Sequence, residues 1–459
     1  MTGKLLIKDV TNLVAFEPAI KLQAISADLR NPYFKDYILT QDLADVYERI
    51  LSSILGTGWG STASTLPAER RRSHLISAQY GTGKSYFLMI LSALLNAGGD
   101  PTRLQTAKEK FRAFREVHGL LSQLSDKKFL IIQISAEDKG DIRFRELLVR
   151  SLLDQVTSVL PDVAFSNEYT EAISQLEGVE SSSIGQAFAQ VLDEQFETSL
   201  QQLRAKLGRY DRDGLHTYYK AWERAIGRKL GRDVLDVETT FQEALDLLEP
   251  KGYTHIAVLI DELTTYLNAS AGHHSLAETL GELQAFAAYC NKPTSNCLFV
   301  AAMHVSVKDF LQDRSQQRDY DKMKGRFDEH AFPVYSSKLL AGVFRPKDTF
   351  DEVMEGHRDQ VEDLTDLIET FEMVDDGQPM RLSAFFPLHP AAAYYLPRIS
   401  RELGQAERTS FGFVDEVVRQ KLAEPLVEEQ RLNLVTLDQV FDYFLPAMEQ
   451  KEYYLQVIA

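Results

Sequence analysis

The stretch Ala78-Gln-Tyr-Gly-Thr-Gly-Lys-Ser85 decides how this chain of 459 residues is interpreted. It has an Ala or Gly, four variable residues, and then Gly-Lys followed by Ser or Thr. An apolar run over residues 74–79 leads into it, and helical apolar spacing over residues 86–95 follows it. That setting is typical of a phosphate-binding loop between a strand and a helix. The alternative is a glycine-rich turn that binds no ligand.

The residue types of this loop match the needs of a nucleoside triphosphate. Glycines let the backbone turn tightly, so that successive N–H groups point toward phosphate oxygens. Lys84 can reach the β- and γ-phosphates, and the Ser85 hydroxyl can hold Mg²⁺. The following helix adds the partial positive charge of its N-terminus. ATP and Mg²⁺ are therefore the expected cofactors, and the expected nucleotide contacts are Tyr80, Gly81, Thr82, Gly83, Lys84 and Ser85.

A second motif is the apolar strand His255-Ile-Ala-Val-Leu-Ile-Asp-Glu-Leu263, which ends in two carboxylates. Asp261 is expected to reach Mg²⁺ and the nucleotide, and Glu262 to polarise the attacking water as general base. The alternative is a buried strand followed by a solvated acidic turn. One extra strand, predicted at residues 129–135, separates this motif from the loop. That arrangement indicates the additional-strand, catalytic-glutamate (ASCE) division of P-loop ATPases.

Short apolar runs alternate with helical segments from residue 73 onward. Strands are predicted at residues 75–78, 129–135, 256–260 and 298–303, with a weaker fifth at 331–334. Nearly continuous apolar runs are typical of parallel strands covered on both faces. The predicted fold class is therefore α/β: a P-loop NTPase core of AAA+/ASCE-like type around a parallel sheet.

Three regions are expected along the chain. Residues 1–70 form a mostly helical N-terminal region, with a helix at 39–55 capped by Thr40. Residues 71–336 form the P-loop ATPase core, with a helical insertion at about 162–250 that is too long for a simple crossover. Its helical spacing is clearest at residues 186–193 and 196–207. Residues 337–459 form a C-terminal helical, lid-like domain.

Two residues outside the main motifs are candidates for catalysis. His304 follows the strand at 298–303 and is expected to contact the γ-phosphate or the lytic water. Ser306 is the second choice, and a capping role is the alternative. Arg326 precedes the fifth strand and is expected to reach the nucleotide of a neighbouring subunit as a finger. A surface salt bridge with a neighbouring acidic residue is the other interpretation of Arg326.

Arg408 is a candidate sensor that contacts the phosphates of its own chain. A helix-end pair with Glu407 or Glu416 is an equally open interpretation. The triplet Arg70-Arg71-Arg72 is interpreted as solvated charge at a strand entry, in preference to a contact with DNA. The net charge of −17 argues against a basic surface that covers the chain, although it leaves room for a local patch.

The cysteine content and the apolar runs limit which structural sites and which cellular compartment are expected. Cys290 and Cys297 provide neither a disulfide framework nor a zinc pattern, and they are expected to be buried thiols. No window approaches 18 apolar residues, and the N-terminus lacks the apolar core of a signal peptide. A reducing cytoplasm is therefore the expected compartment.

Several segments together resemble one family, the P-loop ATPases of bacteriophage-exclusion (BREX) defence of the BrxC and PglY type. The segments are Gln79-Tyr-Gly-Thr-Gly-Lys-Ser-Tyr-Phe-Leu, Leu259-Ile-Asp-Glu-Leu, Lys322-Met-Lys-Gly-Arg-Phe-Asp, Phe386-Pro-Leu-His-Pro and Glu407-Arg-Thr-Ser-Phe-Gly-Phe. The third is the most specific. The resemblance spans roughly residues 35–445 in motif order. Family members are usually far longer, so the sequence is expected to be an N-terminal fragment or a shortened relative.

The resemblance implies an AAA+-like ATPase that acts with other defence proteins, including methyltransferase or phosphatase-type components, to restrict phage DNA. A homo-oligomer is expected if Arg326 acts between subunits. DNA binding, direct through a local basic patch or indirect, is possible in this setting, and no membrane is involved. Two alternatives stay open: a nucleotide-gated scaffold with little turnover, and a DNA translocase. The acidic charge and the lack of helicase motifs speak against the translocase.

Overall fold

The structure of this chain is a computed structural model, and it describes most of the sequence. The described residues are 5–14, 39–55, 71–78, 83–161, 168–180, 182–209, 211–227, 237–312, 317–331, 340–375, 378–403 and 410–450.

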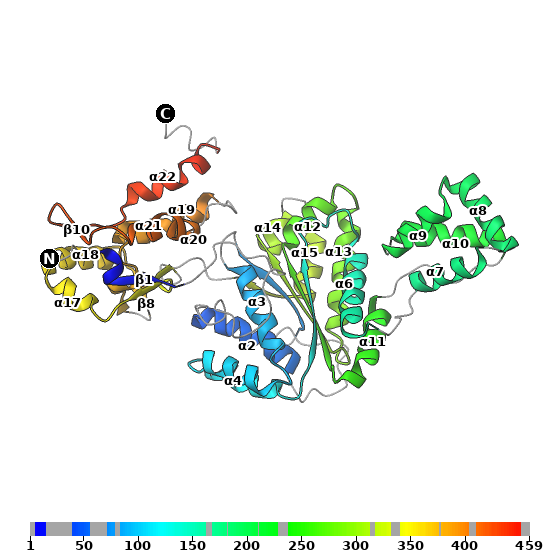
Figure 1. The fold of residues 1–459 in the computed structure, drawn as a ribbon, viewed down its shortest axis with the longest axis horizontal. Coiled ribbons are helices and arrows are strands. Elements are labelled where there is room, and N and C mark those ends of the chain that lie inside the picture. The colour runs from blue at the N-terminus through cyan, green and yellow to red at the C-terminus, as the bar shows by residue number, and fades with distance from the viewer. Residues whose placement is uncertain are drawn as a thin grey trace.

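The centre of the molecule is a five-stranded parallel sheet (Figure 1). Its strands follow the spatial order β3-β4-β5-β2-β6. The mixed α/β class and the parallel sheet are therefore confirmed. The bounds are β2 (Ser73–Ser77), β3 (Phe129–Ser135), β4 (His255–Asp261), β5 (Cys297–Met303) and β6 (Asp328–Ala331).

Helices cover both faces of this sheet, which explains why its inner strands are apolar at almost every position. Neighbouring residues alternate between faces, so that Leu75 and Ile76 belong to two different hydrophobic clusters. Cys290 and Cys297 are buried in the first cluster, as predicted. The helices of the second cluster are α2 (Gln41–Leu55), α3 (Lys84–Leu95), α4 (Pro101–Lys110) and α5 (Arg115–Leu121), followed by η3 (Ser122–Leu124). The first cluster extends into the helical insertion described below, and its helices outside that insertion group are α6 (Phe144–Val159), α11 (Val237–Leu248), α12 (Leu263–Ser270), α13 (Leu276–Cys290), α14 (Val307–Gln312) and α15 (Gln317–Arg326).

The fifth strand lies earlier than the sequence predicts. It runs over Asp328–Ala331, and its residues are half-buried or exposed, as expected for a strand at the edge of the described sheet. The prediction at 331–334 followed an apolar run, whereas the strand itself reads Asp-Glu-His-Ala. Residues 332–334 lie outside the described part of the chain. This strand is only partly covered, so its apolar signal is weak, unlike that of β3 at the opposite edge.

The predicted insertion contains a group of four helices that pack on one another, at the right of Figure 1. The helical spacing predicted over 186–193 and 196–207 is confirmed, except that residues 197–199 separate two helices. The first helix ends at Phe196 because Glu197 takes a left-handed conformation (φ 46°), and Ser199 starts the next one with a capping box to Gln202. The four are α7 (Glu168–Val179), α8 (Ser183–Phe196), α9 (Leu200–Gly208) and α10 (Arg212–Ile226), whereas α11 and η4 (Glu249–Lys251) return to the core beside α6.

The N-terminal segment is divided between two parts of the molecule. As predicted, α2 follows Thr40, whose hydroxyl accepts a hydrogen bond from the Leu43 N–H (3.4 Å). Residues 5–14, in contrast, form η1 (Ile7–Asp9) and β1 (Thr11–Leu13), so the expectation of helix does not hold there. Strand β1 pairs antiparallel with β7 (Phe344–Pro346), and this segment shares a hydrophobic cluster with the C-terminal residues.

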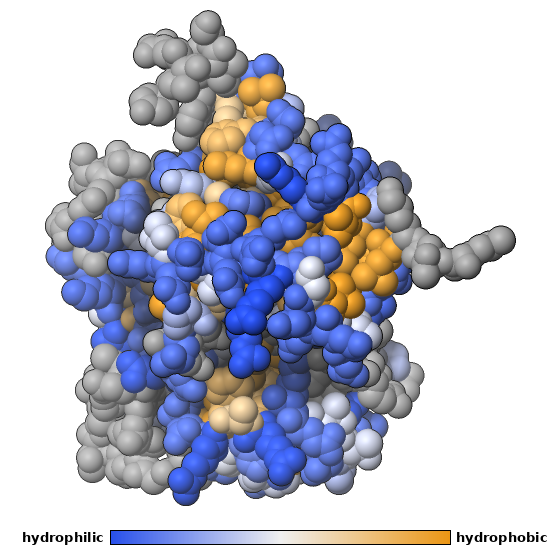
Figure 2. Space-filling view, turned by 90° about the vertical axis from the view of Figure 1, so that its left-hand side faces the viewer, coloured by the Kyte–Doolittle hydropathy of each residue, from blue (hydrophilic) through white to orange (hydrophobic). Residues whose placement is uncertain are grey.

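The C-terminal part, from residue 340 to 450, is mainly helical and has its own hydrophobic cluster. Figure 2 looks onto this end of the molecule and shows a mostly hydrophilic surface interrupted by hydrophobic areas. None of the helices in the described ranges is long and apolar enough to cross a membrane. The remaining elements are α17 (Phe350–Glu355), α18 (Arg358–Thr370), β8 (Val374–Asp375), β9 (Gln378–Pro379), η5 (Leu382–Ala384), α19 (Pro390–Leu403), α20 (Ser410–Phe413), η6 (Val414–Val418), α21 (Arg419–Lys421), β10 (Val427–Glu428), β11 (Arg431–Leu432) and α22 (Leu437–Met448).

Candidate functional site

Three strands of the sheet end at one edge, and the candidate residues follow them there. Ser77 at the end of β2 is in register with Met303 at the end of β5, and the Ala78 N–H donates to the Met303 carbonyl (3.1 Å). Strand β4 lies on the other side of β5 and ends at Asp261. Because the strands are parallel, the segments that leave β2, β4 and β5 start side by side. Ligand sites of open α/β sheets form at this edge.

Helix α3 begins with the lysine of the predicted phosphate loop. Gly83 precedes it with φ +85°, a conformation that glycine adopts without strain, and a Cβ built there meets nothing within 4 Å. Lys84 is the first helical residue, is buried, and donates from Nζ to the Ala78 carbonyl (2.6 Å). Burial lowers the pKa of Lys84 to about 8, although the charges of Asp261 and Glu262 oppose that shift.

Asp261 and Ser85 approach each other across this edge of the sheet. Asp261 is buried, and burial raises its pKa, while a hydrogen bond from the Ser85 side chain and the charge of Lys84 act in the opposite direction. The loop and the acidic strand, some 170 residues apart in sequence, therefore form one group. A hydroxyl and a carboxylate are hard oxygen ligands of the kind that Mg²⁺ prefers, so their chemistry fits the expected ion.

Glu262 is held by two polar neighbours. Its Oε2 accepts a hydrogen bond from the Thr265 hydroxyl (2.9 Å) and is in close contact with Nε2 of His304. Burial alone would raise the pKa of Glu262, but the hydrogen bond and charge of His304, the Thr265 hydrogen bond and the charge of Lys84 outweigh it and lower the pKa. His304 itself is fixed by its backbone N–H, which donates to Thr264 Oγ1 (3.0 Å).

The backbone at Glu262 is strained. Its φ is +63°, in the left-handed region that non-glycine residues rarely occupy. This conformation turns the chain sharply from β4 into α12, while the Glu262 N–H donates to Asp261 Oδ1 (3.0 Å). Strain of this kind costs on the order of 1–3 kcal/mol and gathers at functional sites. The turn aims the two adjacent carboxylates in different directions, Asp261 toward Ser85 and Glu262 toward His304.

Arg326 lies at the other end of the sheet. It precedes β6, whose first residue Asp328 is in register with His74 near the start of β2, so Arg326 lies far along the strand direction from Lys84. Its Nη1 donates to the Gln284 carbonyl of α13 (2.6 Å). The structure therefore does not bring Arg326 to the candidate site of its own chain, and its role between subunits stays a prediction.

Of the remaining candidate residues, only Ser306 lies in the described part of the chain. Ser306 caps the turn into α14, where its hydroxyl accepts from the Asp309 N–H (3.1 Å) and donates to the Asp309 carboxylate (2.7 Å). Tyr80, Gly81, Thr82 and Arg408 lie outside the described residues.

The interpretation of the arginine triplet as solvated charge is wrong for Arg72, whereas Arg71 is half-buried. Arg72 is buried, and its guanidinium donates to the backbone carbonyls of Ser53, Lys292 and Ser295. Arg71 donates to the carbonyls of Lys324 (2.8 Å) and Phe327 (3.0 Å). Both fasten the start of β2 to neighbouring segments.

Sequence reasoning missed Thr264 and Thr265, which hold His304 and Glu262 in place. Their only signal is their position two and three residues after Glu262. Comparison with protein-family models, with curated proteins and with solved structures finds no match to this chain.

Proposed function

We propose that this protein binds and hydrolyses ATP with Mg²⁺, as a P-loop NTPase of the additional-strand division. The observation that carries the proposal is the convergence of Lys84 and Ser85 at the start of α3 with Asp261 and Glu262 at the end of β4. In the sheet, β5 lies between β2 and β4, so one strand separates the two motifs, as that division requires. Strand β3, which was expected from chain order to be the separating strand, lies on the far side of β4.

Each of these residues has a task in the proposed reaction. The Lys84 ammonium neutralises charge on the β- and γ-phosphates, and the first N–H groups of α3 point at phosphate oxygens. Ser85 and Asp261 would hold Mg²⁺, which when bound would supply charge compensation to the phosphates. Glu262 accepts a proton from the attacking water, and its lowered pKa keeps it ionised and ready to do so near neutral pH.

His304 is proposed to set the position of Glu262. Its ring contacts the carboxylate oxygen that also accepts from Thr265, so the general base is fixed from two sides. The same contact supports a second candidate function, a nucleotide-gated scaffold. While His304 holds Glu262, the carboxylate is engaged by the protein and turnover stays low.

The proposal also covers the biological process in which the ATPase acts. The motif resemblance supports an AAA+-like component of a BREX-like anti-phage complex, in which ATP drives assembly or remodelling of a protein–DNA complex. A homo-oligomer would bring Arg326 to the nucleotide of a neighbouring subunit, which requires its contact with the Gln284 carbonyl to open. Other defence proteins, with methyltransferase or phosphatase-type components among them, and DNA are the partners that this setting implies.

The test compares steady-state ATP hydrolysis by the native chain and by Glu262→Gln. Loss of a general base lowers the rate by about 10²–10⁴-fold, while ATP binding, measured in parallel by calorimetry, stays within a few-fold. A native rate that is negligible and insensitive to this substitution, to added DNA and to partner proteins would support the scaffold. Failure of the native chain to bind ATP would overturn both.

A further inference from the structure

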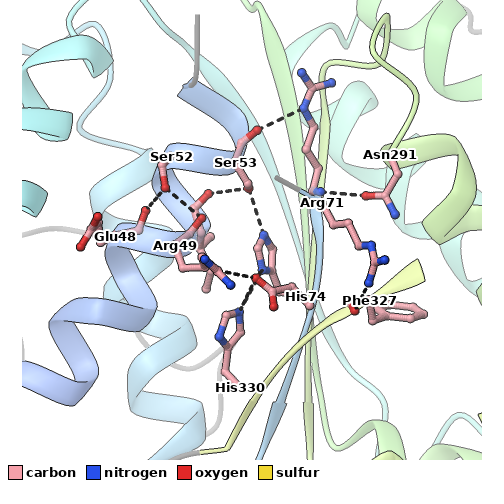
Figure 3. A network of polar contacts seen from close by, with 12 residues as sticks. Glu48, Arg49, Ser52, Ser53, Arg71, His74, Asn291, Phe327 and His330 are labelled. Carbon is pink, nitrogen blue, oxygen red and sulfur yellow. Dashed lines mark hydrogen bonds and ion pairs between the residues drawn. The ribbon is translucent and has the colours of Figure 1, made fainter. Parts of the chain in front are cut away.

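A second polar cluster lies under α2, on the face of the sheet away from α13 (Figure 3). His74 of β2 is fully buried, and its Nδ1 lies 3.0 Å from Nε2 of His330 on β6. Asp328, two residues before His330 on the same strand, places Oδ2 at 4.0 Å from His74 Nδ1 and 3.7 Å from His330 Nε2. Among the described residues, this is the only group of three His, Cys, Asp or Glu side chains close enough to share one ion.

The cluster is built by strand register. His74 is paired with Asp328 and Ile76 with His330, so residues two apart on β6 face the same side as His74. Asp328 and His330 retain 15% and 10% exposed side-chain area, which leaves the cluster accessible from the surface while His74 forms its buried wall.

Ser53 of α2 determines which nitrogen of His74 faces the cluster as an acceptor. The Ser53 hydroxyl donates to the Ile50 carbonyl (2.7 Å), so its oxygen must accept from His74 Nε2, 3.0 Å away. His74 Nε2 therefore carries the proton in the neutral ring, and Nδ1 presents its lone pair toward His330 and Asp328. A histidine ligand is typically oriented in this way by a hydrogen bond from its other nitrogen.

We propose that His74, Asp328 and His330 bind one divalent transition-metal ion, with Zn²⁺ as the best match. Donor atoms that bind the same zinc ion at about 2.0–2.2 Å lie roughly 3–4 Å from one another, and the three separations here are 3.0, 3.7 and 4.0 Å. Two imidazoles and one carboxylate suit zinc, cobalt or nickel, whereas Mg²⁺ prefers oxygen ligands. This site is separate from the Ser85 and Asp261 pair, and it does not depend on ATP hydrolysis.

Arg49 competes with the ion in this arrangement. Its Nε donates to Asp328 Oδ2 (2.9 Å), the same oxygen that faces the two histidines. The Arg49 side chain is 44% exposed, so it can turn into solvent when the ion takes its place. Metal binding would then tie the edge strand β6 to β2, the strand that leads into Lys84.

The experiment measures Zn²⁺ binding by calorimetry and Co²⁺ binding by ligand-field absorption, on the full chain freed of metal and in excess Mg²⁺. One transition-metal ion per chain is expected. His330→Gln and Asp328→Asn should each weaken binding by at least about 100-fold. The double variant His273→Gln/His274→Gln, which changes two neighbouring histidines in the turn after α12, should bind like the parent.

The substitution Arg49→Met should change the metal affinity in the opposite direction, and it is therefore the sharper test. Removing a positive charge next to the ion should tighten binding by about tenfold. Unchanged or weaker binding by Arg49→Met would overturn coordination through Asp328. No bound ion, or equal affinity in His330→Gln and the parent, would overturn the site. If His330→Gln does not fold, as judged by circular dichroism of the metal-free protein, the Arg49→Met result still decides.

Discussion

The two polar clusters of the sheet are assembled in different ways. At the carboxyl edge, Lys84 and Asp261 belong to contiguous motifs: Lys84 begins the helix after β2, and Asp261 is the last residue of β4. Under α2, His74, Asp328 and His330 come together only through the register of β2 and β6. A site made by chain continuity can therefore be predicted from sequence, whereas a site made by strand pairing needs the fold.

The substitution Lys84→Met is expected to have the largest effect, and it should affect only the cluster at the carboxyl edge. Lys84→Met removes the ammonium but keeps most of the side-chain length, so ATP affinity should fall on the order of 100-fold. Zn²⁺ affinity should not change. Because burial already disfavours the charged form of Lys84, the variant should fold at least as stably as the parent. Calorimetry with ATP and with Zn²⁺ measures the two affinities. A parallel loss of Zn²⁺ binding would show that the two clusters are not independent.

Sequence predicted the carboxyl edge well because its signals are local. Strands β4 and β5 are buried on both faces, and β3 at the edge keeps a fully buried face, so their apolar runs mark all three within a residue of their bounds. The acidic pair after β4 then follows from position alone. His304 was placed by the same logic, one residue beyond β5, but its contact with Glu262 needs the three-dimensional arrangement.

Other features of the fold could not be predicted from the sequence, for identifiable physical reasons. Strand β6 reads Asp-Glu-His-Ala and is half-buried or exposed throughout, so no apolar run marks it, whereas β3 at the opposite edge keeps one. Arg72 was interpreted as solvated because charge suggests exposure, although three backbone carbonyls satisfy it inside. The antiparallel pairing of β1 with β7 joins segments more than 300 residues apart, which no local pattern records.

The pH dependence of ATP binding tests the electrostatics of the carboxyl edge. Lys84 has a pKa of about 8 without nucleotide, and phosphates would raise it because they favour the charged ammonium. Below pH 8 the ammonium is already formed and affinity should be flat. Above pH 8 a proton must be taken up on binding, so affinity should fall by up to about tenfold per pH unit.

Calorimetry in buffers of different ionisation enthalpy measures this proton uptake directly. Lys84→Met supplies the control, since its residual binding should show no uptake above pH 8. Proton release by the native chain, or equal uptake by both proteins, would show that another group is responsible.

His304→Gln is expected to have a smaller, pH-dependent effect. Burial raises the pKa of Glu262, and the hydrogen bond and charge of His304 are the strongest of the interactions that lower it. Without the imidazole, the Glu262 pKa should rise, so the base is lost at a higher pH on acidification. The ratio of turnover at pH 8 to that at pH 6 should therefore increase a few-fold. Ser306→Ala, which alters only the cap of α14, should leave the profile unmoved.

The smallest expected effect concerns Ser53 on the buried face of α2. In Ser53→Ala the buried His74 Nε2–H loses its acceptor, which should lower the free energy of unfolding of the metal-free protein by about 1–2 kcal/mol. Alanine also raises helix propensity, which would mask part of the loss. Ser52→Ala corrects for this, because the Ser52 hydroxyl donates only to carbonyls of its own helix. Denaturant unfolding of the two variants in parallel measures the difference. If Ser53→Ala is as stable as Ser52→Ala, the His74 ring is not anchored by Ser53, and its Nδ1 lone pair has no fixed direction toward Asp328 and His330.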